Sequence, residues 1–492
     1  MTIVLTGRDL TLAEVVRVAR GDERVQLHSA VPAAMNGTRA VLERSLKRGD
    51  EVYGLTTGVG ATKHFRIDPC RLTEFNHRLV RACAVGQGPD APEEVVRGTL
   101  LRLADGFAST SAAVRPELAQ RLVDALNRHE HPRVRMLGSI GQADLVPLGE
   151  LAAGILGDFE LAPKEGLALV SSSAFSTSIA ALAVADYARL LDAADAAAAL
   201  DLEAFAANLT MLHPAVGRAR PFPGLVETLQ RLRAILEGSY LWQRGAPRNL
   251  QDPLTFRCVP QVHGSVRDTL SFAHQQLAVE LNASQENPLV LAEEDRLISV
   301  GNFDVLTLAA CLDYLRIALA PLLTSAQERL VKLLQAPTSG LPQNLAARAG
   351  GVDLALSELG VVGQALTAEA RLLAQPVSYE LASSSHDQGL DDRMTMAPLA
   401  ARRVADMVAL GERIIATELV VAAQAIDLRR GTPLGFGTQR LHDLVRQEIA
   451  FTGDGEDPPH DLEGVRGLIR SGVLSTLVKS ARNATSAPLR VC

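Results

Sequence analysis

Apolar residues recur at helical spacing along three long stretches of this chain. Residues 174–212 contain neither glycine nor proline, and this run predicts one long helix. A second helix is predicted from about Asp304 to Gln335, where Pro321 is expected to introduce a kink. A third is predicted from Met394 to Leu428. Its apolar stripe consists of Val404, Met407, Val408 and Ile415.

The remaining sequence has a different character on either side of these helices. Residues 1–170 mix short helical patterns with loops that contain glycine and proline, and residues 431–492 combine a polar segment with one more short helix. A helix of about 35 residues is about 50 Å long, and such helices usually pack against others of similar length, often across subunits. We therefore predict a mainly α protein with a mixed N-terminal region, an elongated bundle over residues 171–430, and an oligomeric state.

The composition is that of a folded protein and narrows the possible partners. Hydrophobic residues make up 47% of the 492 residues, charged residues 21% and aromatic residues 4%. The net charge of −7 is spread along the chain without a run of lysine or arginine, so no nucleic-acid partner is expected. No membrane role is expected either, because charges interrupt the alanine-rich helix. These charges are Asp186, Arg189, Asp192 and Asp195.

The spacing of the cysteines and the N-terminal segment indicate the cellular compartment of the protein. The five cysteines are scattered and show no CxxC spacing, which is typical of a reducing compartment and predicts no thiolate metal site. The N-terminal segment lacks the basic and apolar regions of an export signal. We expect a cytoplasmic protein without a bound metal.

A glycine-punctuated loop at residues 52–60 is the first candidate for chemistry. It reads Val-Tyr-Gly-Leu-Thr-Thr-Gly-Val-Gly and places Tyr53 beside backbone that glycine keeps adaptable. This arrangement suits a catalytic phenol. On its own, however, such a loop is more often an ordinary turn with a packed tyrosine.

Further motifs follow this loop in a fixed order. They are Leu137–Gly141, Asp144–Leu148, Lys164–Leu169, Arg220–Gly224, Leu250–Asp252 with Phe256–Val262, Glu280–Ser284 with Asn287–Leu289, Gly301–Phe303, Gln327–Arg329 and Ser339–Pro342. In this order and at these separations the set resembles the histidine and phenylalanine/tyrosine ammonia-lyases, over at least residues 12–430. The resemblance implies an ammonia-lyase/fumarase-like helical fold, a small-molecule substrate, and a homotetramer whose active sites are shared between subunits.

The resemblance also implies roles for individual residues. The family tyrosine that matches Tyr53 removes a β-proton from the substrate. The arginine that matches Arg257 pairs with the substrate carboxylate, a task suited to a planar fork of donors. Gln251 and Phe303 match residues that line the same site. A phenol with an ordinary pKa near 10 acts as a base only where its surroundings stabilise phenolate.

The segment that forms the family's electrophile is different in this chain. The family builds a methylidene-imidazolone group from Ala-Ser-Gly, between the glycine that matches Gly141 and the aspartate that matches Asp144. Here that interval holds only Gln142 and Ala143, and no Ala-Ser-Gly occurs elsewhere. We therefore expect no methylidene-imidazolone cofactor, and interpret residues 141–144 as a remnant of the cofactor loop.

Other positions of the matching site also differ. Ser171 occupies the place of an asparagine that supports the cofactor, Leu254 that of a second catalytic tyrosine, and Cys83 that of a histidine in histidine-specific enzymes. The family's Gln-Glu motif corresponds to Asp387–Asp392, with Gln388 as the glutamine and Asp391 as a candidate for the glutamate. Cys83 is either a nucleophile or a small buried apolar residue.

These observations favour an enzyme that keeps the lyase pocket but works without the electrophile. The amino group of an amino acid is then a poor leaving group, so classical deamination is not expected. Elimination, conjugate addition, isomerisation or cyclisation of a small carboxylate or carbonyl substrate, centred on Tyr53, is the leading hypothesis. The alternatives are a non-catalytic ligand-binding or scaffold pseudoenzyme, and an ammonia-lyase of an aromatic amino acid. The sequence leaves open the substrate and whether it is free or carrier-bound.

Overall fold

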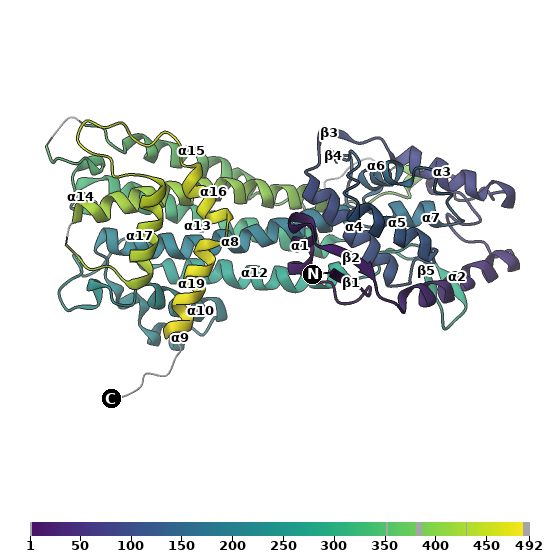
Figure 1. Ribbon diagram of the computed structural model, residues 1–492, viewed down its shortest axis with the longest axis horizontal. Coiled ribbons are helices and arrows are strands. Elements are labelled where there is room, and N and C mark those ends of the chain that lie inside the picture. Colours follow the sequence, from purple (N-terminus) through teal and green to yellow (C-terminus); the bar gives the residue numbers. More distant parts are fainter. Residues whose placement is uncertain (1, 351–352, 380–385, 430, 486–492) are drawn as a thin grey trace. The chain divides into compact units, whose positions relative to one another are not determined.

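The computed structural model describes residues 2–350, 353–379, 386–429 and 431–485 (Figure 1). Its fold is mainly α, as predicted from the sequence, and the strands within these residues form three two-stranded sheets. The chain forms two compact units. Unit 1 comprises Met1–Ala185, Ala273–Asp313 and Pro376–Arg402, and unit 2 comprises Asp186–Phe272, Tyr314–Gln375 and Arg403–Cys492. Each unit is assembled from three separate segments of the chain. The three regions predicted from the sequence, with bounds at residues 170 and 430, are consecutive stretches of the chain and are not the same as these units.

Unit 1 surrounds a buried helix, α4. Its elements are β1 (Thr2–Leu5), α1 (Leu12–Gly21), β2 (Arg24–Leu27), α2 (Val31–Arg48), η1 (Gly60–Thr62), η2 (Pro69–Arg71), α3 (Leu72–Cys83), β3 (Gln87–Asp90), α4 (Glu93–Ala108), α5 (Pro116–Asn127), β4 (Arg135–Leu137), α6 (Leu145–Leu156), α7 (Glu165–Val170), β5 (Leu289–Leu291), β6 (Arg296–Ile298) and η6 (Asp387–Gly389). Helix α4 packs against α1 and α5, and α3 packs against α6 and α7. The pair β1–β2 is parallel, whereas β3–β4 and β5–β6 are antiparallel.

Unit 2 consists of helices only, within its described residues. The shorter ones are η3 (Leu209–Leu212), α9 (Pro214–Ala219), α10 (Pro223–Ile235), η4 (Tyr240–Trp242), α11 (Leu254–Arg257), α14 (Ala336–Ser339), η5 (Gln343–Leu345), α15 (Ser357–Leu373), α17 (Phe436–Glu448), α18 (Glu463–Arg470) and α19 (Val473–Thr485). Helix α10 packs against α17 and α19. Phe205 and Phe256 stack with their ring centroids 4.0 Å apart, which fixes α11 against the end of a long helix.

Four long helices contribute residues to both units. They are α8 (Ala174–Phe205), α12 (Val259–Asn282), α13 (Leu306–Leu334) and α16 (Ala397–Arg429). Three of them confirm the predicted helices, and Pro321 lies inside α13. The predicted end of the first helix at residue 212 is wrong. It ends at Phe205 because Ala206 adopts a left-handed φ of 56° and the Ala207 N–H donates to the Leu202 carbonyl at 2.8 Å, a helix-ending arrangement that usually uses glycine.

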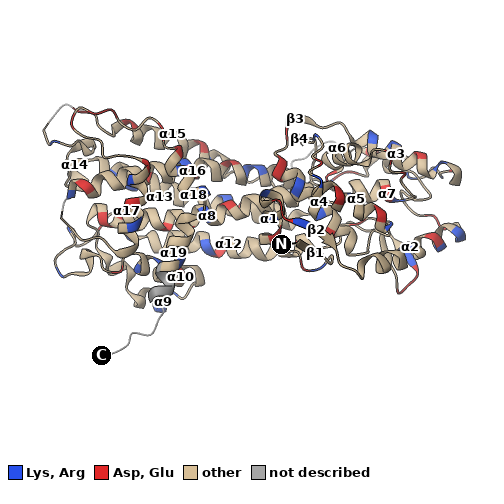
Figure 2. Cartoon of the chain, in the orientation of Figure 1, with Lys and Arg blue, Asp and Glu red and all other residues tan. Residues whose placement is uncertain are grey.

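Two stretches, Glu165–Phe205 and Leu306–Leu334, are long and apolar enough to span a membrane by length and composition. The most apolar window of the first is 100% buried and that of the second 56% buried within the structure. The cores of large helical proteins contain helices of the same kind. Figure 2 shows lysine and arginine interspersed with aspartate and glutamate over the described residues, without a continuous basic stripe.

Candidate active site

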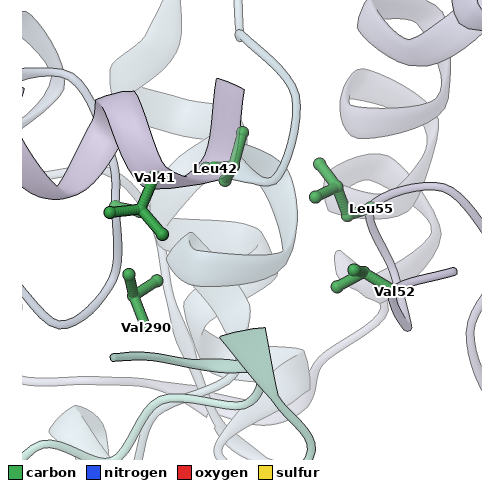
Figure 3. Packing of buried hydrophobic residues seen from close by; sticks show 6 residues of the cluster. Val41, Leu42, Val52, Leu55 and Val290 are labelled. Atoms are coloured by element: carbon green, nitrogen blue, oxygen red, sulfur yellow. The ribbon is translucent and has the colours of Figure 1, made fainter. Parts of the chain in front are cut away.

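The loop that carries Tyr53 is anchored on both sides of the tyrosine. Val52 is 8% exposed and Leu55 is 1% exposed, and both belong to a cluster with Val41 and Leu42 of α2 and Val290 of β5 (Figure 3). Each such side chain contributes roughly 1.5–3 kcal/mol when it is fully buried. The buried apolar side chains therefore hold the loop in place, while the side chain of Tyr53 between them remains only half-buried.

Tyr53 itself is half-buried, and its phenol is held from one side. The Gly60 N–H donates a hydrogen bond to the Tyr53 hydroxyl oxygen at 3.0 Å. Burial raises the pKa of Tyr53 above its ordinary value of 10.0, and the carboxylates of Asp391 and Asp387 raise it further, against the effect of the Gly60 hydrogen bond. At neutral pH this tyrosine is therefore a neutral phenol, suited to donate a proton or a hydrogen bond.

Gly60 also contacts the segment that contains Gln388. A Cβ built on Gly60, whose φ is +57°, would lie 2.0 Å from Asp387 Oδ2, so only glycine allows this approach. Asp387 and Gln388 have positive φ angles of 48° and 59° in the short helix η6. Gln388 is exposed, and it lies one residue from the carboxylate that reaches the tyrosine loop. The structure thus brings Tyr53 and the Gln388 segment together.

The remnant of the cofactor loop is closed by hydrogen bonds. The Thr395 hydroxyl donates to the Gly141 carbonyl at 2.7 Å, and Gln142 Nε2 donates to Asp304 Oδ2 at 2.8 Å. Ala143 is 5% exposed with a φ of 58°.

Asp144 lies at the end of this loop and is fully buried. It accepts hydrogen bonds from the Ser176 N–H, the Ser176 hydroxyl and the Ser139 hydroxyl at 2.7–2.8 Å. Burial nonetheless raises the pKa of its carboxyl group above the usual value. The residues from Gly141 to Asp144 thus have structural partners, and they do not fit a methylidene-imidazolone group, since the serine and the second glycine of its precursor are missing.

Two further residues predicted for the site lie next to this loop. Ser171 is 5% exposed, and its hydroxyl has no hydrogen-bond partner within the described part of the chain. The following Ser172 carbonyl accepts from the Asp144 N–H at 2.7 Å. Phe303 is half-buried, and its carbonyl accepts from the Ser173 hydroxyl at 3.1 Å. Hydrogen bonds therefore connect the segments of Ser171, Phe303 and the cofactor-loop remnant within unit 1.

Cys83 ends helix α3 and packs against α6. A Cβ built on Gly149 would lie 2.6 Å from the Cys83 Cβ, which shows how closely the two helices approach. Burial raises the pKa of the Cys83 thiol to about 11. A thiol of this kind is a weak nucleophile at neutral pH, which favours the apolar interpretation of this residue.

Gln251 and Arg257, which the sequence resemblance assigns to substrate binding, line a common pocket in unit 2. This open pocket of 310 Å³ is formed by Asn208, Thr210, Met211, Leu250, Gln251, Asp252 and Arg257. Arg257 Nε is buried and has no hydrogen-bond partner among the residues the structure describes. An arginine nitrogen without a partner, beside an amide side chain, is suited to bind a carboxylate.

Leu254 lies at the other end of α11 and faces a different environment. Its side chain is 62% exposed. It lines an apolar pocket of 270 Å³ with Thr255, Cys258, Val259, Val262 and Ser325. Leu254 therefore presents an apolar surface at the position that the sequence resemblance matches to a second tyrosine.

Arg329 is a residue whose role the sequence did not predict. It is fully buried, and it pairs with Asp201 at 2.8 Å and Glu418 at 2.7 Å. Its Nη1 also donates to the Thr255 carbonyl of α11 at 3.3 Å. Burial and the adjacent Glu418 carboxylate raise the pKa of Asp201 well above 3.8. This network supports the helix that carries Arg257. The sequence signal was the Gln-Glu-Arg motif, which places a charge in an otherwise apolar helix.

One group of potential metal ligands occurs among the described residues, and it lies away from these segments. Glu93, His129 and His131 place ligand atoms within 4.8 Å of one another. However, Arg97 Nη1 lies 3.3 Å from His129 Nδ1 and 3.2 Å from His131 Nε2. A guanidinium group in this position repels a cation and occupies the imidazole lone pairs, so the group is not a metal site.

Unit 1 holds a tyrosine on a glycine loop, and unit 2 holds a buried arginine nitrogen without a partner among the described residues, beside an amide side chain. The long helices and these residues are those of the lyase class that the sequence motifs resemble. The comparisons with known proteins agree with this class. The chain matches the aromatic amino acid lyase family over residues 10–160 and 158–447, and it belongs to this family. It is similar to the histidine ammonia-lyase of Alkaliphilus metalliredigens, with 33% identity over 91% of this chain and 92% of that protein.

Solved structures extend the comparison to other activities. Ergothionase from Treponema denticola, an ergothioneine-degrading enzyme, has a TM-score of 0.90 at 27% identity, over 96% of this chain and 99% of that chain. Tyrosine aminomutase from Streptomyces globisporus has a TM-score of 0.91 at 27% identity, over 98% of this chain and 99% of that chain. The fold is therefore shared by lyases and aminomutases.

Proposed function

We propose that this chain is a lyase-family enzyme that performs acid–base chemistry centred on Tyr53, on a small carboxylate or carbonyl substrate, without a methylidene-imidazolone group. The observation that carries the proposal is the contrast between two sets of residues. Tyr53 and Arg257 are present, with a phenol held by Gly60 and a guanidinium nitrogen without a partner. The Ala-Ser-Gly precursor of the electrophile is absent from the sequence.

The missing electrophile restricts the substrate. A free amino group is a poor leaving group, and the β-proton of an amino acid is very weakly acidic. A suitable substrate therefore brings its own activation, either a carbonyl that acidifies the reacting C–H bond or a leaving group such as a quaternary ammonium. Arg257 and Gln251 would bind its carboxylate, and Leu254 would contact an apolar part.

Turnover by the purified full-length protein tests this proposal. The panel consists of L-histidine, L-phenylalanine and L-tyrosine, their N-trimethyl betaines, and ergothioneine, which a related enzyme degrades. We expect the ultraviolet absorbance of a conjugated product from an activated substrate, and no ammonia from the free amino acids. Tyr53→Phe should abolish turnover, whereas Tyr379→Phe, at a tyrosine that is 52% exposed, serves as the matched control. A fully active Tyr53→Phe variant would refute the assignment.

Two other outcomes identify the alternatives. Ammonia release from a free amino acid would indicate a conventional ammonia-lyase. Intact mass then shows whether the chain has lost two water molecules, as a cyclised precursor would. A biological role that survives substitution of both Tyr53 and Arg257 would indicate a pseudoenzyme that binds a ligand or another protein.

We also propose a homotetramer with active sites shared between subunits. Several large apolar side chains on the long helices and on α15 are exposed in the single chain. They include Tyr314 (47%), Ile317 (46%), Val361 (55%) and Val279 (64%). Exposed apolar surface of this kind favours association. Light scattering coupled to size-exclusion chromatography tests the proposal, and a monomer at micromolar concentration would contradict it.

A further inference from the structure

Two carboxyl groups in unit 2 bind a single guanidinium group. Arg329 of α13 is fully buried, and its Nε donates to Asp201 Oδ2 of α8 at 2.8 Å and to Glu418 Oε1 of α16 at 3.0 Å. Its Nη2 lies 2.7 Å from Glu418 Oε1. All three side chains are 0% exposed. If both carboxyl groups were ionised, this group of three side chains would hold one uncompensated negative charge inside unit 2.

Glu412, on the same helix as Glu418, has the balance expected of a buried carboxylate. It is 7% exposed, and it accepts hydrogen bonds from Arg466 Nε at 3.0 Å and from Arg470 Nε at 2.9 Å. A buried negative charge is costly unless positive charge and hydrogen bonds compensate it. Glu412 meets this condition with two guanidinium groups. Asp201 and Glu418 have one between them among the described residues, so one of the two needs another way to become neutral.

His263 of α12 is a titratable group that could supply the second positive charge, but its contacts favour the neutral form. Its Nδ1 lies 2.9 Å from Asp195 Oδ1, and Asp195 already accepts hydrogen bonds from Arg231 and Arg267. Its Nε2 is buried without a hydrogen-bond partner in the described part of unit 2, so a proton on this nitrogen would have no acceptor there. Burial lowers the pKa of His263 below 6.5, and the imidazole is therefore neutral at pH 7.

We propose that Asp201 and Glu418 share one proton at neutral pH, so that a carboxylic acid and a carboxylate together bind Arg329. Asp201 Oδ2 and Glu418 Oε1 both contact the same nitrogen of Arg329, and this common partner holds the two carboxyl groups close together. Two carboxyl groups at one buried site do not readily both ionise, because like charges repel and burial favours the neutral form. The O–H of one acid donates to an oxygen of the other, and the three side chains carry no net charge.

The electrostatics of the pair agree with a bound proton. Burial, followed by the adjacent Glu418 carboxylate, raises the pKa of Asp201 well above 3.8, against the effect of Arg329. Within the described residues, the other charged or titratable groups that face the pair are Arg329 of α13 and His263 of α12. The stability linked to this proton is therefore present in full below the unfolded pKa of 3.8, and it is lost as the pH rises through the folded value.

The shared proton makes the anchor of α11 sensitive to alkaline pH. Arg329 Nη1 donates to the Thr255 carbonyl of α11 at 3.3 Å, and Arg257 is the last residue of this helix. Loss of the proton leaves a buried negative charge on the side chains that hold Arg329 in place. The acid pair is thus a conformational device of unit 2, and it is distinct from the chemistry proposed for Tyr53.

The first experiment detects the proton in the folded full-length protein. A protonated carboxyl group has an infrared C=O band that a carboxylate lacks, so the difference between wild type and a variant isolates the changed group. At pH 7 we expect Glu418→Gln and Asp201→Asn each to lose the intensity of one protonated carboxyl group, because the remaining acid then pairs with Arg329 as a carboxylate. Glu412→Gln, the matched control on α16, should leave this region of the spectrum unchanged.

The second experiment measures unfolding in urea between about pH 5.5 and about pH 8. A proton bound only in the folded state raises the unfolding equilibrium constant of wild type about tenfold per pH unit in this range. Glu418→Gln binds no such proton, and its amide donates to Asp201 and accepts from Arg329 as the acid does. Its urea midpoint should therefore rise relative to that of wild type as the pH increases. The midpoint of Glu412→Gln should be lower than that of wild type, by an amount that does not change with pH.

Each result supports or overturns the shared proton. Infrared spectra of Glu418→Gln and Asp201→Asn that show no loss of a protonated carboxyl group overturn the proposal, since the pair is then ionised or the proton is on His263. A pH-independent difference between the urea midpoints of Glu418→Gln and wild type overturns it as well. A Glu418→Gln variant that does not fold also counts against it, because glutamine has the shape and the hydrogen bonds of the protonated acid. Neither measurement requires turnover, so the outcome does not depend on the proposed function.

Discussion

Alkylation of Cys83 provides a direct test of how this site differs from that of histidine-specific relatives. By the sequence resemblance, Cys83 matches a position at which those enzymes have a histidine, and a nucleophilic thiolate here would imply covalent chemistry. Burial raises the pKa of its thiol to about 11, compared with an ordinary value of 9.0. At about pH 8 this difference lowers the thiolate fraction from about 10⁻¹ to about 10⁻³.

The expected rate follows from two opposing effects. A thiolate of higher pKa is intrinsically more nucleophilic. With a Brønsted coefficient of about 0.4–0.5, each thiolate reacts roughly 6- to 10-fold faster, which offsets part of the 100-fold lower thiolate fraction. The net expectation is that iodoacetamide modifies Cys83 at least about tenfold more slowly than it modifies the same cysteine in a peptide of residues 79–87. Tryptic mass spectrometry of quenched time points measures both rates.

The opposite result would change the assignment of the site. If Cys83 in the folded protein reacts as fast as the peptide or faster, its surroundings stabilise the thiolate and the apolar interpretation is wrong. The variant Cys83→Ala gives an independent readout. It should change KM more than kcat if Cys83 only lines the pocket, and it should abolish turnover if the sulfur is a nucleophile.

Three further perturbations test the surroundings of the site. Burial raises the pKa of Asp105 to about 6 from 3.8, so the folded state binds this proton more tightly and stability is lost as pH rises from about 4 through 6. Asp105→Asn should remove this loss of stability. After a cost of about 1 kcal/mol for a buried amide without a partner, the free energy of unfolding at neutral pH, measured with urea, should increase by about 2 kcal/mol. Arg329→Met leaves two buried carboxylates without their cation and should destabilise the protein by about 3–5 kcal/mol, as measured by the urea midpoint. Gly60→Ala places a Cβ 2.0 Å from Asp387 Oδ2 and should lower kcat/KM by more than about tenfold. Because the φ of Gly60 is +57°, the alanine should also destabilise the protein by about 1–2 kcal/mol. An unchanged urea midpoint, an unchanged pH slope or full activity would contradict the respective prediction.

The sequence predicted the long helices because their signal is local. An apolar period is sufficient to place α13 and α16, although Pro321 lies in the first and Gly411 in the second, and their observed bounds lie within a few residues of the predicted ones. The end of α8 was missed because Ala206 adopts the left-handed conformation that glycine usually provides. A residue's identity does not reveal this choice, since the tertiary contacts of the following segment determine it.

From the sequence, the residues of the candidate site could be predicted only where they belong to a sequence motif. Tyr53 and Arg257 were found through their motifs, and the structure adds the hydrogen bond to one and the missing partner of the other. The contact between Gly60 and Asp387 joins residues more than 300 positions apart. Long-range contacts of this kind are not encoded in any local pattern, so this contact required the structure.

The hydrogen-bond partners of the polar atoms separate two parts of the site. In the remnant of the cofactor loop, Gly141, Gln142 and Asp144 all bind other residues of the chain, so this segment has become part of the scaffold. Elsewhere, Ser171 Oγ and Arg257 Nε are buried without a partner in the described structure. Buried polar atoms that lack a partner are costly unless a ligand or water binds them. Under the proposed function, a site without the electrophile therefore still offers polar atoms that can bind a substrate. Bound substrate is expected to pair Arg257 while the loop from Gly141 to Asp144 stays unchanged, and a ligand-bound structure that leaves Arg257 unpaired would refute this reasoning.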